Sequence, residues 1–264
     1  MMSVLSQQIS AEEATQPALE IQGRIATITL RKPAFSNRLS PADLAALRTH
    51  IETVNQADDV LVLRLRSDGK YFCSGYDISS LASESAPSSL YFGETIDLLE
   101  NVRAVTIAAV QGGAYGGGTD LCLACDFRIG TPQANMFMPA ARLGLHFYPG
   151  GMRRYLSRLG VNAAKHLFLT AERIEADEML RIGFLTELVA ADQLTARVDA
   201  LSGLLAGMAP LALWGIKQDL NRLIAGTFDE ADNARAVLRS EASDDMREGA
   251  RAWKEKRAPR FRGK

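Results

Sequence analysis

Two segments of this sequence place glycines and small polar residues where backbone groups can do chemistry. One is GGGTD at 116–120, which ends the glycine-rich stretch 112–118; the other is FCSGYDI at 72–78. Each follows an apolar run of strand length, at 105–110 and 60–65 respectively. A glycine-rich turn that opens a helix leaves N–H donors without partners, with the positive end of the helix dipole behind them. The stretch at 112–118 therefore indicates a site for an anion.

The glycines do not complete a nucleotide-binding motif. A P-loop needs Gly-Lys-Ser/Thr, whereas Thr119 here follows Gly118 directly. The acid that would complete a Gly-x-Gly-x-x-Gly dinucleotide fingerprint is not at the required distance. Phosphate-binding turns, tight packing and plain loops all use glycine, so the stretch alone leaves its ligand open.

The three cysteines predict a reduced, cytoplasmic protein without disulfides. Their count is odd and sparse, and the segment 1–17 lacks the basic and apolar regions of a secretory signal. Cys122 and Cys125 match C-x-x-C, but they lie in the apolar run LCLACDF and no second pair completes a zinc site. We expect no metal.

Composition narrows the class of partner. The chain has 264 residues, 47% of them apolar and 23% charged, with a formal net charge of −1. This balance argues against a general nucleic-acid binder, and the lack of a long apolar run argues against a membrane span. The stretch 246–264 carries eight basic residues against two acids. It is either a solvated tail or a segment that contacts phosphates.

Hydrophobic periodicity predicts an α/β core followed by a helical extension. The runs 60–65 and 105–110 are continuous, as in strands covered on both faces. Strands separated by helices come first, and the pattern after residue 149 is mostly helical. We divide the chain into a flexible leader (1–17), a core (18–200) and a C-terminal helical region (201–264). The helices expected are 41–55, 88–102, 150–158, 161–169, 175–181, 192–207, 210–224 and 229–254.

Four segments, in this order and spacing, resemble the enoyl-CoA hydratase/isomerase (crotonase) family. They are LRKPAFSNRLSPADL, VLVLRLRSDGKYFCSGYDI, TIAAVQGGAYGGGTDLCLACDFRIG and FMPAARLGLHFYPGGMRRYLSRLG. The resemblance covers about residues 19–264 and implies a spiral of ββα units with a C-terminal helical trimerisation region. It also implies a homotrimer or hexamer and an acyl-CoA substrate, with CoA as part of that substrate and no separate cofactor.

The resemblance assigns roles to residues of this chain. The backbone N–H groups of Tyr76 and Gly117 form an oxyanion hole for a thioester enolate, and Asp120 is the acid/base. The residues that it places around the substrate are Ala34, Phe35, Cys73, Gly75, Tyr76, Asp77, Ile78, Tyr115, Gly116, Gly117, Pro139, Ala140, Leu143 and Tyr148.

One departure from the family pattern bears on the reaction. Hydratases hold a water between two glutamates, and Ala140 stands where the second would be. One carboxylate can shuttle a proton between two carbons, so isomerisation or other one-base enolate chemistry (decarboxylation, C–C hydrolysis) is easier here than fast hydration. His146 is either a substitute donor or a packed or surface imidazole, and Tyr148 is either a substitute donor or pocket lining. A non-catalytic acyl-CoA or RNA-binding member is the remaining alternative.

Overall fold

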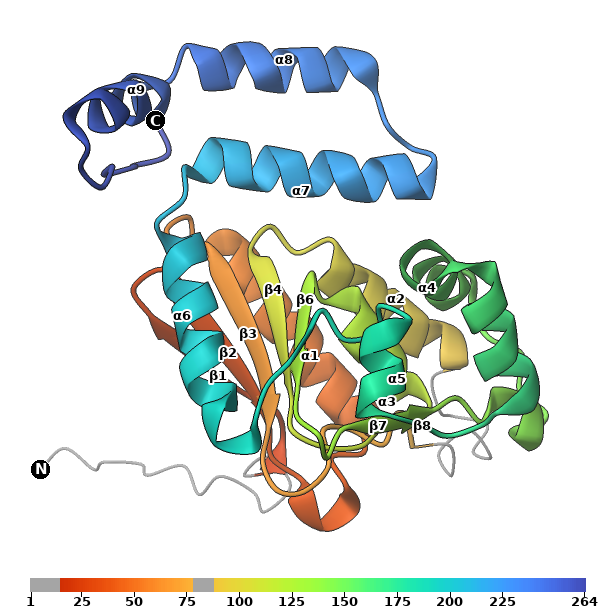
Figure 1. The fold of residues 1–264 in the computed structure, drawn as a ribbon. Helices are drawn as coiled ribbons and strands as arrows, with labels where there is room; N and C mark the ends of the chain where they lie inside the picture. The colour runs from red at the N-terminus through yellow and green to blue at the C-terminus, as the bar shows by residue number, and fades with distance from the viewer. Residues whose placement is uncertain (1–14, 78–87) are drawn as a thin grey trace, which may run out of the picture.

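A six-stranded sheet forms the centre of the computed structural model, which describes residues 15–77 and 88–264 (Figure 1). The strand order is β1-β2-β3-β4-β6-β9; β1 and β2 form an antiparallel hairpin, and the remaining neighbours are parallel. Parallel neighbours end at the same edge of the sheet, so the loops after them meet there. The strands are β1 (Ala18–Gln22), β2 (Ile25–Leu30), β3 (Val62–Ser67), β4 (Val105–Val110), β6 (Phe127–Gly130) and β9 (Glu187–Leu188).

Helices cover both faces of this sheet. The face with Val62, Ile107 and Ile129 packs against α6 (Leu194–Ala206). The opposite face packs against helices that enclose the main hydrophobic core (Figure 1). Buried apolar side chains on both sides explain the continuous apolar runs of β3 and β4. Three of the helices that contribute to the main core are α1 (Pro41–Gln56), α2 (Ser89–Glu100) and α3 (Gly117–Ala124).

A second, three-stranded sheet continues the architecture of short strands alternating with helices. Its order is β5 (Ala114–Tyr115), β7 (Asn135–Phe137) and β8 (Ile174–Glu175). Two helices follow β7 and β8, namely α4 (Pro149–Thr170) and α5 (Ala176–Arg181). The short 3-10 helices are Pro33–Phe35, Ala140–Leu143 and Ala191–Gln193.

The last three helices extend beyond the sheet. After α6 the chain forms α7 (Pro210–Ala225), then folds back along it as α8 (Glu230–Glu241), and ends in α9 (Asp244–Glu255) (Figure 1). Within the described ranges no single helix is long and apolar enough to cross a bilayer; the segments Ala191–Ala206 and Pro210–Ala225, bent by 108°, meet the criterion only when joined.

Two sequence-based boundaries are corrected. The expected division between residues 200 and 201 falls inside α6, which packs on the sheet, so the helical extension begins only at α7. The expected single helix over 229–254 is two helices, because the side chain of Ser243 accepts a hydrogen bond from the Met246 N–H and caps a new one. Of the expected leader, residues 1–14 lie outside the part that the structure describes.

Candidate active site

The two glycine-containing loops pack against each other through their backbones. The N–H of Tyr115 donates to the carbonyl of Cys73 at 2.9 Å. A Cβ atom on Gly75 would lie 2.7 Å from the Gly117 nitrogen, and one on Gly118 would lie 2.2 Å from the Cys73 oxygen. Gly75 also has a φ of +90°, which side chains disfavour. Glycine is therefore required at positions 75 and 118. Tyr76 is the residue that follows Gly75 in the chain.

Gly117 is the first residue of α3. In the first turn of a helix the N–H groups have no acceptor within the helix, and the dipole adds a partial positive charge there. Gly116, with a φ of +51°, makes the turn from β5 into this helix. The arrangement can hold a negatively charged oxygen at the wall of the pocket described next.

An apolar pocket of about 370 Å³ opens beside these loops. Of the residues expected around the substrate, nine line it: Tyr76, Asp77, Tyr115, Gly116, Gly117, Pro139, Ala140, Leu143 and Tyr148. Four others do not line it, namely Ala34, Phe35, Cys73 and Gly75. Ile78 falls outside the described residues. Nine of the fourteen expected residues thus share one pocket, and their contact with a substrate stays a prediction.

Cys73 is excluded from the pocket by its burial. Its side chain is fully buried, and its thiol donates to the Asn37 carbonyl at 3.2 Å. Burial raises the pKa of this thiol to about 12, so it stays protonated and inert at neutral pH. Phe35, in contrast, lies on the surface and is 63% exposed.

Nine further residues line the pocket that the sequence did not assign to it. Six of them lie within two residues of a predicted residue, and His146 was considered only as a substitute donor. Phe92 had no local signal, because it belongs to the buried face of α2 and looks like any core residue. The nine are Arg38, Ser74, Ser89, Phe92, Phe137, Met138, Leu145, His146 and Phe147.

Asp120 does not line the pocket, and its assignment as the acid/base stays a prediction. Its side chain is fully buried. One carboxylate oxygen accepts from Arg154 Nε at 2.7 Å; the other accepts from Arg154 Nη2 and from the Tyr148 hydroxyl, both at 2.7 Å. Tyr148 does line the pocket. The Tyr148 hydroxyl thus links the Asp120 carboxylate to the pocket.

Arg154 is the centre of a charge network that includes Asp120. It is fully buried on α4 and also donates to Asp97 at 2.6 Å and to Glu100 at 2.9 Å on α2. Burial alone would lower the pKa of Arg154, but Asp120, then Glu100 and Asp97, raise it above its usual value overall. Burial, followed by Asp120, raises the pKa of Tyr148 well above its usual value, so the phenol stays neutral.

The other polar groups of the pocket are less buried than Asp120 and Arg154. His146 is exposed, and its Nδ1 lies 2.8 Å from the Phe147 carbonyl oxygen. The Tyr115 hydroxyl donates to Asn135 at 2.8 Å, and Arg38 pairs with Asp77 at 3.2 Å. Within residues 15–77 and 88–264, no group of three His, Cys, Asp or Glu side chains could hold a metal. The expectation of no metal stays a prediction.

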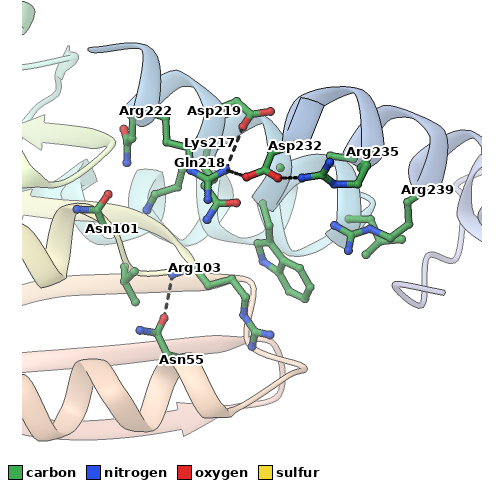
Figure 2. A pocket seen from close by; sticks show the side chains of 16 residues that line it. Asn55, Asn101, Arg103, Lys217, Gln218, Asp219, Arg222, Asp232, Arg235 and Arg239 are labelled. Carbon is green, nitrogen blue, oxygen red and sulfur yellow. Dashed lines mark hydrogen bonds and ion pairs between the residues drawn. The ribbon is translucent and has the colours of Figure 1, made fainter. Parts of the chain in front are cut away.

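A larger hollow of about 640 Å³ lies between the core and the helices α7 and α8 (Figure 2). Its wall is about equally polar and apolar, and most of its basic side chains pair with acids. Arg222 pairs with Asp219 and Asp232, and Asp232 also pairs with Arg235. The hollow contains neither of the two glycine loops, so the apolar pocket is the better candidate for chemistry.

Comparison with known proteins shows the family to which the chain belongs. The family model described as enoyl-CoA hydratase/isomerase matches residues 20–264. The short-chain-enoyl-CoA hydratase of Clostridium acetobutylicum is 31% identical over 252 residues, which are 93% of this chain and 97% of that protein. The crotonyl-CoA hydratase of Syntrophomonas wolfei is 32% identical over 250 residues, which are 92% of this chain and 96% of that protein.

The fold is also found among solved structures. A putative enoyl-CoA hydratase/isomerase family protein from Hyphomonas neptunium superimposes with a TM-score of 0.89 at 28% identity, and the match covers 95% of this chain and 99% of that one. The match extends through the helical extension as well as the sheet. The chain is a member of the enoyl-CoA hydratase/isomerase (crotonase) family.

Proposed function

We propose that this protein processes an acyl-CoA by stabilising its thioester enolate with the backbone N–H groups of Tyr76 and Gly117. The observation that carries the proposal is the close backbone approach of Gly75 to Gly117, which brings Tyr76 and Gly117 to the wall of one apolar pocket. The first turn of α3 adds a favourable dipole. In a low-dielectric site each such donor contributes on the order of 10²–10³ in rate.

The proton path runs through Tyr148 in this proposal. Asp120 keeps its place in the family pattern, but its carboxylate reaches the pocket only through the Tyr148 hydroxyl. Tyr148 donates its proton to Asp120, so its oxygen can accept a proton from the substrate while Asp120 takes the phenolic one. This relay moves one proton at a time, which suits transfer between two carbons of an enolate.

Hydration is the second candidate, because the two relatives named above are both hydratases. Ala140 stands at the position of the second acid, so a water would have to be held by other groups. Exposed His146 lies on the wall of the pocket and could take this part. Comparing the loss of the enoyl absorbance of crotonyl-CoA with deuterium uptake at its carbon atoms separates hydration from isomerisation.

Exchange of the C2 hydrogens of butyryl-CoA in deuterated water tests enolate formation without assuming the final reaction. We expect the wild type to catalyse this exchange and Gly117→Pro to lower its rate by about 10²–10³-fold, because proline removes the N–H donor. Proline is tolerated in the first helical turn, so α3 should still form.

Gly117→Ala is the matched control for this experiment. A Cβ at residue 117 would lie 2.6 Å from the Phe92 ring, so both variants introduce the same collision, but alanine keeps the N–H. We expect Gly117→Ala to retain most of the exchange that proline abolishes. Equal losses in both variants, or no exchange by the wild type, would remove Gly117 from the proposed oxyanion hole.

The proposal includes the CoA moiety and the assembly. We propose that the adenine of CoA lies near the loop 73–78 and that its phosphates lie near Arg31, Lys32 or the basic tail at 246–264. Of these, Lys32 already pairs with Asp43 at 2.7 Å and Arg31 donates to the Gln16 carbonyl. We further propose a homotrimer or hexamer formed through α7–α9, in the cytoplasm. RNA binding stays the less favoured alternative, which a gel-shift assay at physiological salt would test.

A further inference from the structure

Aromatic side chains are concentrated around the proposed acyl pocket. The chain has ten phenylalanines, six tyrosines and two tryptophans. One third of them line this single pocket, although they come from five separate parts of the chain: the loop after β3, α2, β5, β7 and the loop before α4. Folding therefore gathers them. The six are Tyr76, Phe92, Tyr115, Phe137, Phe147 and Tyr148.

The rings form two groups on the pocket wall. In the first, Phe92 lies 5.7 Å from Tyr76 and 6.0 Å from Tyr148 between ring centroids, and Tyr148 stacks on Phe147 at 4.3 Å. In the second, Tyr115 and Phe137 are 4.8 Å apart. The hydroxyl groups of Tyr148 and Tyr115 are tied to Asp120 and Asn135, so both rings are held in place.

The first group borders the position where the acyl carbons must lie. The Phe92 ring is so close to Gly117 that a Cβ there would meet its Cζ atom at 2.6 Å. An acyl group whose carbonyl oxygen is held at the Gly117 N–H therefore has the Phe92 ring beside it. A Cβ on Gly93 would likewise meet the Tyr148 ring at 2.6 Å, so α2 and Tyr148 are in close contact.

From this wall we infer that the substrate is an aryl or aryl-conjugated acyl thioester. The inference rests on the proposed function, since it concerns the acyl group held at the same oxyanion hole. Fixed aromatic rings attract another π-system by offset or edge-to-face contacts, beyond the gain from apolar burial. A saturated acyl group of the same size gains the burial alone.

Two ligands of matched size test this preference. Benzoyl-CoA and cyclohexanecarbonyl-CoA both carry a six-membered ring, and only the first is aromatic. By calorimetry we expect the wild type to bind benzoyl-CoA about 3- to 10-fold more tightly. Phe92→Leu and Phe147→Leu should each reduce this ratio toward one, because leucine keeps apolar volume without a π-system.

Tyr91→Leu is the matched control. Tyr91 neighbours Phe92 in α2, but its ring lies under Arg48 at 4.5 Å and does not line the pocket. We expect this variant to keep the wild-type ratio. Phe147 is only half-buried, so its variant remains informative if Phe92→Leu fails to fold. A wild-type ratio near one, or a ratio unchanged in a folded pocket variant, overturns the inference. Failure of both acyl-CoA ligands to bind would instead overturn the proposed function.

Discussion

At the scale of single residues, the ion pair between Asp120 and Arg154 decides how the site can work. Both groups are fully buried and joined by two hydrogen bonds of 2.7 Å. A buried pair of this kind contributes little net stability compared with apolar packing, but removal of one partner leaves an uncompensated charge. Asp120 is therefore a structural residue as well as a member of the proposed proton path, and its mutation affects both.

Asp120→Asn and Tyr148→Phe separate these two contributions. We expect Asp120→Asn to lower the free energy of unfolding by about 3 kcal/mol, because Arg154 keeps only Asp97 and Glu100 as charged partners. Tyr148→Phe removes one hydrogen bond and leaves the ion pair, so we expect a loss of about 1 kcal/mol. Urea unfolding of both variants measures the difference.

For Tyr148→Phe, we expect the effect on the reaction rate to be large although its effect on stability is small. If Tyr148 passes the proton, Tyr148→Phe lowers the rate of C2 exchange by about 10²-fold despite its small effect on stability. A Tyr148→Phe protein that exchanges at the wild-type rate would show that the proton takes another route, with exposed His146 the next group to examine.

The buried thiols predict how stability depends on alkaline pH. Burial raises the pKa of Cys73 and of Cys125 to about 12, whereas an unfolded thiol ionises near pH 9.0. Between pH 9 and 12 the unfolded state has therefore lost protons that the folded state keeps. The contribution of these thiols to the free energy of unfolding should be complete below pH 9. Above pH 9 the free energy of unfolding should fall by at most about 1.4 kcal/mol per pH unit for each thiol.

Cys125→Ala isolates one thiol from the other groups that titrate in this range. Urea unfolding at pH 8, 9, 10 and 11 should give a shallower decline for the variant than for the wild type. The cavity left by the sulfur lowers the whole curve, but only the missing thiol changes its slope above pH 9. Parallel curves would contradict the raised pKa.

At the scale of elements, local sequence patterns predicted which helices and strands exist better than they predicted where each begins and ends. The apolar run 105–110 coincides with β4, whereas the run 60–65 begins two residues before β3. Val60 and Leu61 are buried without being in the strand, so hydrophobicity alone could not mark its start. The break between α8 and α9 did have a local signal, since Ser243 is followed by two acids, as is typical of a helix start.

In the candidate site, too, local sequence patterns identified some residues and missed those that come together only when the chain folds. The placement of Tyr76 and Gly117 at the pocket could be predicted from the family resemblance of their two motifs, and their role in an oxyanion hole stays a prediction. Phe92 could not, because the buried face of α2 gives no sign of which residues meet a pocket and which meet the core. Nor could the burial of Asp120, since its partner Arg154 lies 34 residues along the chain and meets it only when α3 and α4 pack.

At the scale of the whole molecule, the helical extension leaves apolar surface uncovered. On α7 the exposed residues Ile216, Leu220, Leu223 and Ile224 follow helical spacing along one face. On α9, Trp253 is 88% exposed. Single exposed apolar residues are ordinary, but a continuous face of this kind marks an interaction surface. The extension is therefore built to pack against something beyond its own core.

A second copy of this chain is the partner that we propose for the extension. Light scattering at micromolar concentration should give a mass of three or six times 28.7 kDa. Leu220→Glu combined with Leu223→Glu places charges on the exposed face of α7, and we expect this variant to dissociate while its circular dichroism stays native, since neither side chain is buried. Leu169→Glu is the control, because Leu169 on α4 is 74% exposed but lies outside the extension, so the assembly should survive it. A monomeric wild type would contradict the proposal, as would an assembly that tolerates the two charges on α7, because the face would then contact something other than another subunit.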